Sequence, residues 1–212
     1  MTVSVREPAT TPVPRPPGAP LRPRHSPLGW LVPRPVRRRI DRFDDSVDAA
    51  VDVMRGNPHT DRLFYVASEL GDFSLIWLVL GTAQGLRSEH AMRRALRLAA
   101  ALGVESALVN VVVKAVVRRR RPVVEFARPL PLRLPRTTSF PSGHASAAFT
   151  AAALLSDGEP PAVRRFYYLL AGVVATSRVY VKIHHASDVV GGAAIGAVLG
   201  ALVRRAFPLS RR

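Results

Sequence analysis

Long apolar segments, separated by short basic connections, limit the folds open to this chain more than any other feature of its sequence. A helix that crosses a membrane needs about 20 mostly apolar residues, since each residue rises about 1.5 Å against a hydrocarbon core of about 30 Å. Five segments approach this length. They cover residues 63–86, 96–117, 141–155, 163–181 and 189–203. Because we find no strand pattern and no internal repeat, the sequence predicts an all-α integral membrane bundle with about five transmembrane helices.

The first 39 residues differ from the rest in composition. Residues 1–39 are rich in Pro and Arg and contain few large apolar side chains, so they cannot bury enough surface to fold. They also lack the continuous apolar stretch of a secretory signal. We therefore expect a disordered tail over residues 1–39 and a membrane domain over residues 40–212.

The segment that opens the predicted domain has helical spacing but is too polar to cross a bilayer. Between Ile40 and Met54, apolar side chains recur at helical intervals and aspartates occupy the other face. This pattern favours an amphipathic helix lying in the membrane interface. A basic cluster in and before this segment is suited to anionic lipid headgroups, although a merely solvated run of charges has the same sequence; it consists of Arg34, Arg37, Arg38, Arg39 and Arg42.

The charge balance narrows the range of partners. Lys and Arg number 31 against 15 Asp and Glu, a formal net charge of +16, which favours nucleic acid, anionic lipid or a phosphorylated substrate. A nucleic-acid binder would show a basic stripe with interleaved aromatic residues, and the sequence has none, so we expect no nucleic acid. The absence of cysteine excludes disulfides, zinc–thiolate sites and cysteine nucleophiles.

A polar stretch from Ser177 to Asp188 lies between two apolar segments. If it were helical, His184 and Asp188, four residues apart, would share a face. A carboxylate beside an imidazole fixes its tautomer and makes the other ring nitrogen a better base or nucleophile. Arg178 adds a planar cation suited to phosphate or carboxylate. A His beside an Asp at a helix start is also compatible with simple capping, so this stretch alone does not decide the function.

Two further polar clusters should meet this stretch at one end of the bundle. Antiparallel helices joined by short turns bring alternate helix ends to the same side. The residues gathered there are Lys114, Arg121, Ser142, Gly143, His144, Arg178, His184 and Asp188. Three cations at a membrane face are electrostatically unfavourable without an anion. A phosphoryl group fits, because Lys and Arg bind its oxygens, a helix N-terminus offers free N–H groups, and a glycine allows close approach.

These residues resemble the three-part signature of the type 2 phosphatidic acid phosphatase superfamily. The matching positions are Lys114-x6-Arg121-Pro122, Pro141-Ser142-Gly143-His144 and Ser177-Arg178-x5-His184-x3-Asp188. All three parts are present in order, and the flanking apolar segments suit the membrane-bound branch. The resemblance implies an all-helical fold and hydrolysis of phosphate esters without a metal or any other cofactor.

The resemblance also implies a role for each position. His184 would be the nucleophile and form a phosphohistidine, and Asp188 would orient its ring and stabilise its developing charge. His144 would protonate the departing alkoxide and then activate water. The phosphate oxygens would be held by the side chains of Lys114, Arg121 and Arg178, with the backbone N–H groups of Ser142 and Gly143 assisting.

Polar residues outside the three-part signature are not expected to be catalytic. His185 is a rival nucleophile, but His184 alone has the family spacing from both Arg178 and Asp188. Lys182 and Arg118–Arg120 are expected to contact headgroups or solvent. Ser106 and Asn110 are expected to form interhelical hydrogen bonds. The sequence predicts no firm role for Glu105, Glu69 or Asp72.

The sequence therefore predicts a membrane lipid phosphate phosphatase that binds a phosphorylated lipid and membrane lipids. Phosphatidate, phosphatidylglycerol phosphate, and polyprenyl phosphates or diphosphates all present a suitable terminal phosphate. The alternatives are a phosphatase of polyprenyl-linked sugar phosphates in cell-envelope synthesis, a vanadate-dependent haloperoxidase, and a non-enzymatic protein that binds anionic lipid. The continuous apolar segments argue against a haloperoxidase, because that branch is soluble.

The compact form suggests a multi-pass protein of a bacterial cell membrane. Basic residues are nearly balanced between the two sides, so the positive-inside rule does not decide the orientation. We expect the active site to face the cytoplasm, because no segment that would export the amino-terminal tail is recognisable. Oligomeric state is not predicted by any feature of the sequence.

Overall fold

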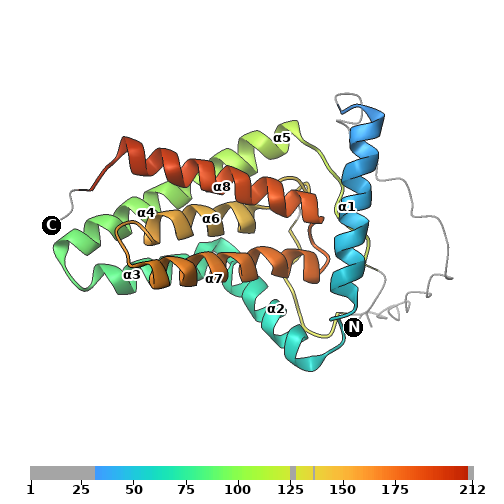
Figure 1. Cartoon of the computed structure of the whole chain (residues 1–212), viewed down its shortest axis with the longest axis horizontal. Helices are drawn as coiled ribbons and strands as arrows, with labels where there is room; N and C mark the ends of the chain where they lie inside the picture. The colour runs from blue at the N-terminus through green and yellow to red at the C-terminus, as the bar shows by residue number, and fades with distance from the viewer. Residues whose placement is uncertain (1–31, 125–127, 136, 210–212) are drawn as a thin grey trace, which may run out of the picture.

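The computed structural model describes residues 32–124, 128–135 and 137–209, which form helices and connecting loops without any strand. The elements are α1 (Arg34–Asp52), α2 (Pro58–Leu70), η2 (Asp72–Ser74), α3 (Leu75–Gly85), α4 (Glu89–Ala107), η3 (Leu108–Val113), α5 (Lys114–Val116), α6 (Gly143–Leu155), α7 (Pro161–Tyr180) and α8 (Ala186–Ala206). The predicted all-α fold is confirmed. Helices α3, α4, α6, α7 and α8 lie alongside one another, with α6 packed against α4, α7 and α8 (Figure 1).

Each predicted membrane segment corresponds to a helix or a broken helix. By length and apolar composition, Glu89–Val116 and Ala186–Ala206 could each cross a membrane. The pair Pro58–Leu70 and Asp72–Gly85, bent by 68°, would make a third span. Helix α6 has 13 residues and is short for a span, and α7 contains three arginines, Arg164, Arg165 and Arg178. The count of five spans therefore stays a prediction.

The bend between α2 and α3 lies at Gly71–Ser74. Phe73 and Ser74 both adopt left-handed backbone conformations, with φ of 52° and 60°. Such angles are unfavourable for residues other than glycine, so the surrounding packing holds them. A Cβ on Gly71 would lie 2.6 Å from Cδ2 of His144 on α6. The bend thus brings the backbone of the first predicted span directly against the amino-terminal end of α6.

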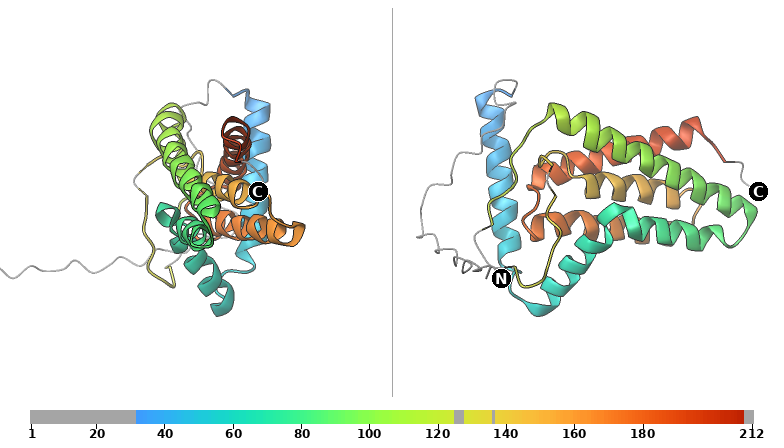
Figure 2. Two further views of the ribbon diagram at one scale, coloured as in Figure 1. Left: turned by 90° about the vertical axis from the view of Figure 1, so that its left-hand side faces the viewer. Right: turned by 180° about the vertical axis from the view of Figure 1, so that it is seen from behind.

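Helix α1 runs across one end of the bundle, roughly perpendicular to the long helices (Figures 1 and 2). Asp44 faces the protein and is 2% exposed, whereas Phe43 is 43% exposed. Arg55, just after α1, donates to the carbonyl oxygens of Val179 and Tyr180 at the end of α7. This placement fits a helix in the membrane interface. Helix α1 begins at Arg34, within residues 1–39, the segment predicted as a tail. Most of that segment lies outside the described residues.

Helices α6 and α8 make the most extensive contact of the bundle, because glycines remove the side chains between them. A Cβ on Gly192 or Gly196 would overlap the carbonyl oxygen of Ser142 or Ser146 on α6. These atoms belong to the backbone, which cannot move aside as a flexible side chain can. Gly192 and Gly196 therefore allow α6 and α8 to pack closely.

Replacing Gly196 with alanine should therefore destabilise the protein by about 1–3 kcal/mol, the usual range for overpacking a tight contact. The matched control is Gly172→Ala on α7, where a Cβ would meet nothing within 4 Å. In that open position alanine should be neutral, or stabilising by up to about 1 kcal/mol. Thermal unfolding in detergent measures both, and equal melting temperatures would contradict the proposed importance of the α6–α8 contact.

Candidate active site

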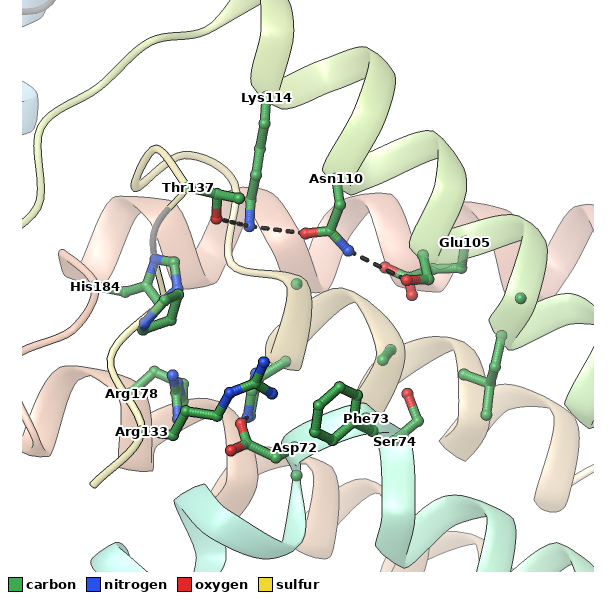
Figure 3. Close-up of a pocket in the computed structure, with 18 of the residues that line it drawn as sticks. Asp72, Phe73, Ser74, Glu105, Asn110, Lys114, Arg133, Thr137, Arg178 and His184 are labelled. Atoms are coloured by element: carbon green, nitrogen blue, oxygen red, sulfur yellow. Dashed lines mark hydrogen bonds and ion pairs between the residues drawn. The ribbon is translucent and has the colours of Figure 1, made fainter. Parts of the chain in front are cut away.

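A cavity of about 940 Å³ opens at the end of the bundle nearest α1, between α3, α4, α6 and the loops that follow α5 and α7. Among its lining residues are most of the predicted site residues: Lys114, Arg121, Gly143, His144, Arg178 and His184. Figure 3 shows Lys114, Arg178 and His184 arranged around this space. The structure therefore brings together residues from all three predicted clusters.

Neutral oxygen atoms hold two of the three cations. Lys114 is 7% exposed, and its Nζ donates to Oδ1 of Asn110 at 2.9 Å and to Oγ1 of Thr137 at 3.2 Å. Arg121 donates to the carbonyl oxygens of Thr137 and Ile183, each at 2.9 Å. Burial lowers the pKa of Arg121 to about 10, which leaves it charged at neutral pH. Asn110 bonds within its own helical segment, to Lys114 and Ser106, and not between helices as expected.

Arg178, in the last turn of α7, is the most deeply buried cation of the cavity. It is 1% exposed, and one of its terminal nitrogens donates to the hydroxyl of Ser68. Its Nε and its second terminal nitrogen are buried and have no hydrogen-bond partner within the described ranges. A buried guanidinium with unused donors is unfavourable unless an anion completes it. Arg178 is therefore prepared to bind an anion.

His184 lies in the turn between α7 and α8 and not on a helix with Asp188. Its Nδ1 is 3.7 Å from Oδ2 of Asp188, beyond hydrogen-bond distance, and its Nε2 is 3.2 Å from a terminal nitrogen of Arg121. Burial and the charges of Arg121 and Arg178 lower the pKa of His184 to about 3, although Asp188 opposes this shift. The imidazole is thus neutral at pH 7, and one ring nitrogen keeps a lone pair.

Asp188 is fully buried in α8 and is held chiefly by residues other than His184. It accepts hydrogen bonds from Oγ of Ser139 at 2.6 Å and from the backbone N–H of His185 at 2.9 Å. A terminal nitrogen of Arg119 lies 2.7 Å from its Oδ1, and the other terminal nitrogen of Arg119 contacts Asp44 of α1 at 2.5 Å. Arg119 therefore joins two buried carboxylates.

The prediction that Arg119 contacts headgroups or solvent was wrong. Burial lowers its pKa, but the carboxylates of Asp188 and Asp44 outweigh this effect and raise the pKa of Arg119. The sequence did not identify Arg119, because a run of four arginines gives no signal as to which one turns inward. Without Arg119, nothing in the sequence pointed to its partner Asp44. Similarly, Lys182 pairs with Asp48 of α1 at 2.9 Å.

Two other site residues have contacts that differ from those expected. The backbone N–H of Ser142 donates to the carbonyl oxygen of Asp188 at 3.0 Å, so this group is not free for a phosphate. The hydroxyl of Ser142 instead caps α6 by accepting from the N–H of Ala145. His185, the rival nucleophile, points elsewhere, since its Nε2 lies 3.2 Å from the carbonyl oxygen of Arg120.

His144 lines the cavity at the start of α6, with a partner that the sequence did not predict. Its Nε2 lies 2.9 Å from Oδ1 of Asp72 and 3.1 Å from the carbonyl oxygen of Ser68. Asp72 comes from the bend between α2 and α3. Within the described residues, no group of three or more His, Cys, Asp or Glu side chains is arranged to hold a metal ion.

The chain is similar to known phosphatases. A family model described as "PAP2 superfamily" matches residues 94–212. Decaprenylphosphoryl-5-phosphoribose phosphatase of Mycobacterium tuberculosis is 35% identical over 139 residues, which cover 64% of this chain and 74% of that protein. Phosphatidylglycerophosphatase B of Bacillus subtilis is 36% identical over 107 residues, covering 46% of this chain and 50% of that protein.

Two crystal structures have a similar fold. That of LpxE from Aquifex aeolicus has a TM-score of 0.62 and 26% identity, covering 76% of this chain and 93% of that one. That of a transmembrane PAP2-type phosphatidylglycerolphosphate phosphatase from Bacillus subtilis has a TM-score of 0.64 and 24% identity, covering 86% and 91%. The second likeness supports the fold alone.

Replacing Arg119 with alanine should be strongly destabilising, by about 3–5 kcal/mol, because removal of one partner leaves buried charges unpaired. The matched control is Arg118→Ala, since Arg118 is exposed on the adjacent position of the same run. Thermal unfolding of the two purified variants measures the difference. If both variants melted at the same temperature, the described Asp44–Arg119–Asp188 contacts would not stabilise the fold.

Proposed function

Because the chain belongs to the PAP2 superfamily and is a membrane phosphatase of lipid phosphates, we propose that it acts through a phosphohistidine at His184. The observation that supports this most directly is the unsatisfied guanidinium of Arg178 beside a neutral imidazole in one cavity. A phosphoryl group has the charge and the acceptor oxygens that Arg178, Arg121 and Lys114 can bind. The imidazole offers the lone pair that attack on phosphorus requires.

In the first step, a ring nitrogen of His184 attacks phosphorus while the bond from phosphorus to the lipid oxygen breaks. The electron pair of that bond goes to the lipid oxygen, which takes a proton from His144. Arg121 contacts Nε2 of His184 in the resting site, and an incoming phosphate oxygen would take over that donor. The three cations stabilise the charge that builds on the phosphoryl oxygens.

In the second step, water attacks phosphorus and gives a proton to His144. The bond from phosphorus to His184 breaks, its electron pair returns to the imidazole, and inorganic phosphate leaves. Asp188 acts in both steps by its charge at 3.7 Å from Nδ1 of His184, which stabilises the positive charge that develops on the ring. No metal ion is needed in this sequence of steps.

We propose a polyprenyl-linked sugar phosphate as the substrate. One support is the similarity to decaprenylphosphoryl-5-phosphoribose phosphatase. The other is the wall of the cavity: Glu105, Ser106 and Asn110 line it along α4 and η3, next to the apolar Leu78 and Leu102. Polar groups suited to sugar hydroxyls thus lie between the cations and an apolar region suited to a lipid chain.

The enzymatic proposal is tested by phosphate release from detergent-purified protein in the presence of EDTA. The panel contains a polyprenyl-linked pentose phosphate, phosphatidate, phosphatidylglycerol phosphate and a polyprenyl diphosphate. The sugar-containing lipid should be hydrolysed fastest. His184→Asn should lower the rate by at least about a thousandfold, as loss of a nucleophile does, whereas His185→Asn should retain activity in folded protein.

Three outcomes would contradict parts of this proposal. Preference for another lipid would reject the sugar phosphate as substrate. Loss of activity in His185→Asn but not in His184→Asn would reassign the nucleophile. Abolition by EDTA, with restoration by a divalent cation, would reject the metal-independent mechanism.

We further propose that the active-site end faces the cytoplasm of a bacterial cell. Since the chain has no cysteine, single cysteines report the orientation. Arg118→Cys, at the active-site end, should react with a membrane-impermeant thiol reagent after permeabilisation only. The control, Arg87→Cys in the loop between α3 and α4 at the opposite end, should react in intact cells. The reverse labelling would overturn the proposed orientation.

A further inference from the structure

We infer that Asp72 is the positioning residue of His144 and directs its Nδ1 at the leaving lipid oxygen. This inference rests on the proposed function, in which His144 transfers the proton. Asp72 Oδ1 lies 2.9 Å from Nε2 of His144, and the carbonyl oxygen of Ser68 lies 3.1 Å from the same nitrogen. Both neighbours are acceptors, so Nε2 carries a proton. The nitrogen that exchanges a proton with substrate and water is then Nδ1.

The backbone of the bend holds Asp72 in place for this contact. Asp72 is followed by two residues in left-handed conformations, Phe73 and Ser74. Gly71 lies so close to the imidazole that a Cβ there would be 2.6 Å from Cδ2 of His144. The carboxylate and the ring are thus fixed relative to each other by close packing as well as by their hydrogen bond. Figure 3 shows Asp72 at the cavity, close to Arg133 and Arg178.

The charges around His144 explain why a carboxylate is needed there. A general acid must carry an extra proton, and the nearby guanidinium of Arg178 opposes a second positive charge. Asp72 provides the opposite charge within ion-pair distance. Arg178 is in turn held by the hydroxyl of Ser68, one turn before Asp72 in the same broken helix. Helix α2 and the bend that follows it therefore orient both the phosphate-binding guanidinium and the proton donor.

The test compares substrates whose leaving groups differ in their need for a proton. A lipid alkoxide is a strong base and needs protonation as it departs, whereas 4-nitrophenolate is a weak base and does not. In Asp72→Asn, kcat/KM on the lipid phosphate should fall at least about tenfold, toward the factor of about 10²–10⁴ that general acid catalysis supplies. On 4-nitrophenyl phosphate, kcat/KM should change by less than about threefold.

Two variants provide controls. His144→Ala should show the same dependence on the leaving group as Asp72→Asn. Glu69→Gln removes an exposed carboxylate three residues earlier in the same broken helix, and it should retain activity on both substrates. If Asp72→Asn does not fold, Asp72→Glu takes its place, because the longer side chain displaces the imidazole while keeping the charge.

Equal losses on the two substrates, in variants with an unchanged melting temperature, would overturn the inference and make Asp72 a structural residue. A wild-type protein that releases no phosphate from either substrate would instead overturn the proposed function. These two failures are distinguishable because the first leaves the wild-type activity intact.

Discussion

The gathering of three buried or partly buried cations at one end of a helical bundle is the constraint on which the rest of the structure depends. Lys114 and Arg121 are held by hydroxyl, amide and carbonyl oxygens, which satisfy their donors without cancelling their charge. The carboxylate of Asp188 instead pairs with Arg119, outside the cavity lining. Arg119 thus meets the charge of Asp188, and Lys114 and Arg121 keep their positive charge for a phosphoryl group.

The sequence was sufficient to predict the helical fold and to bring together the cavity residues, because apolar segment length and motif spacing are local properties. The contacts that complete the site could not be predicted in the same way. Arg119 is one of four consecutive arginines, and which one turns inward depends on the path of an irregular loop. Asp72 reaches His144 through a bend that requires left-handed backbone at Phe73 and Ser74, and neither residue type signals such a conformation.

The position of His184 also depends on tertiary structure that its local spacing does not reveal. A spacing of four residues predicted a shared helical face with Asp188, but α8 begins at Ala186, so the two side chains come from a turn and a helix. The result is a separation of 3.7 Å instead of a hydrogen bond.

The PAP2 match spans residues 94–212, yet Asp44, Ser68 and Asp72 all precede it. Helix α1 supplies the carboxylate of Asp44 that contacts Arg119. Helix α2 supplies Ser68, the partner of Arg178, and the bend after α2 supplies Asp72, the partner of His144. The segment by which the chain is identified is therefore smaller than the unit that organises its chemistry. A fragment trimmed to the matched region would keep the motif residues but would lack the three side chains that contact Arg119, Arg178 and His144.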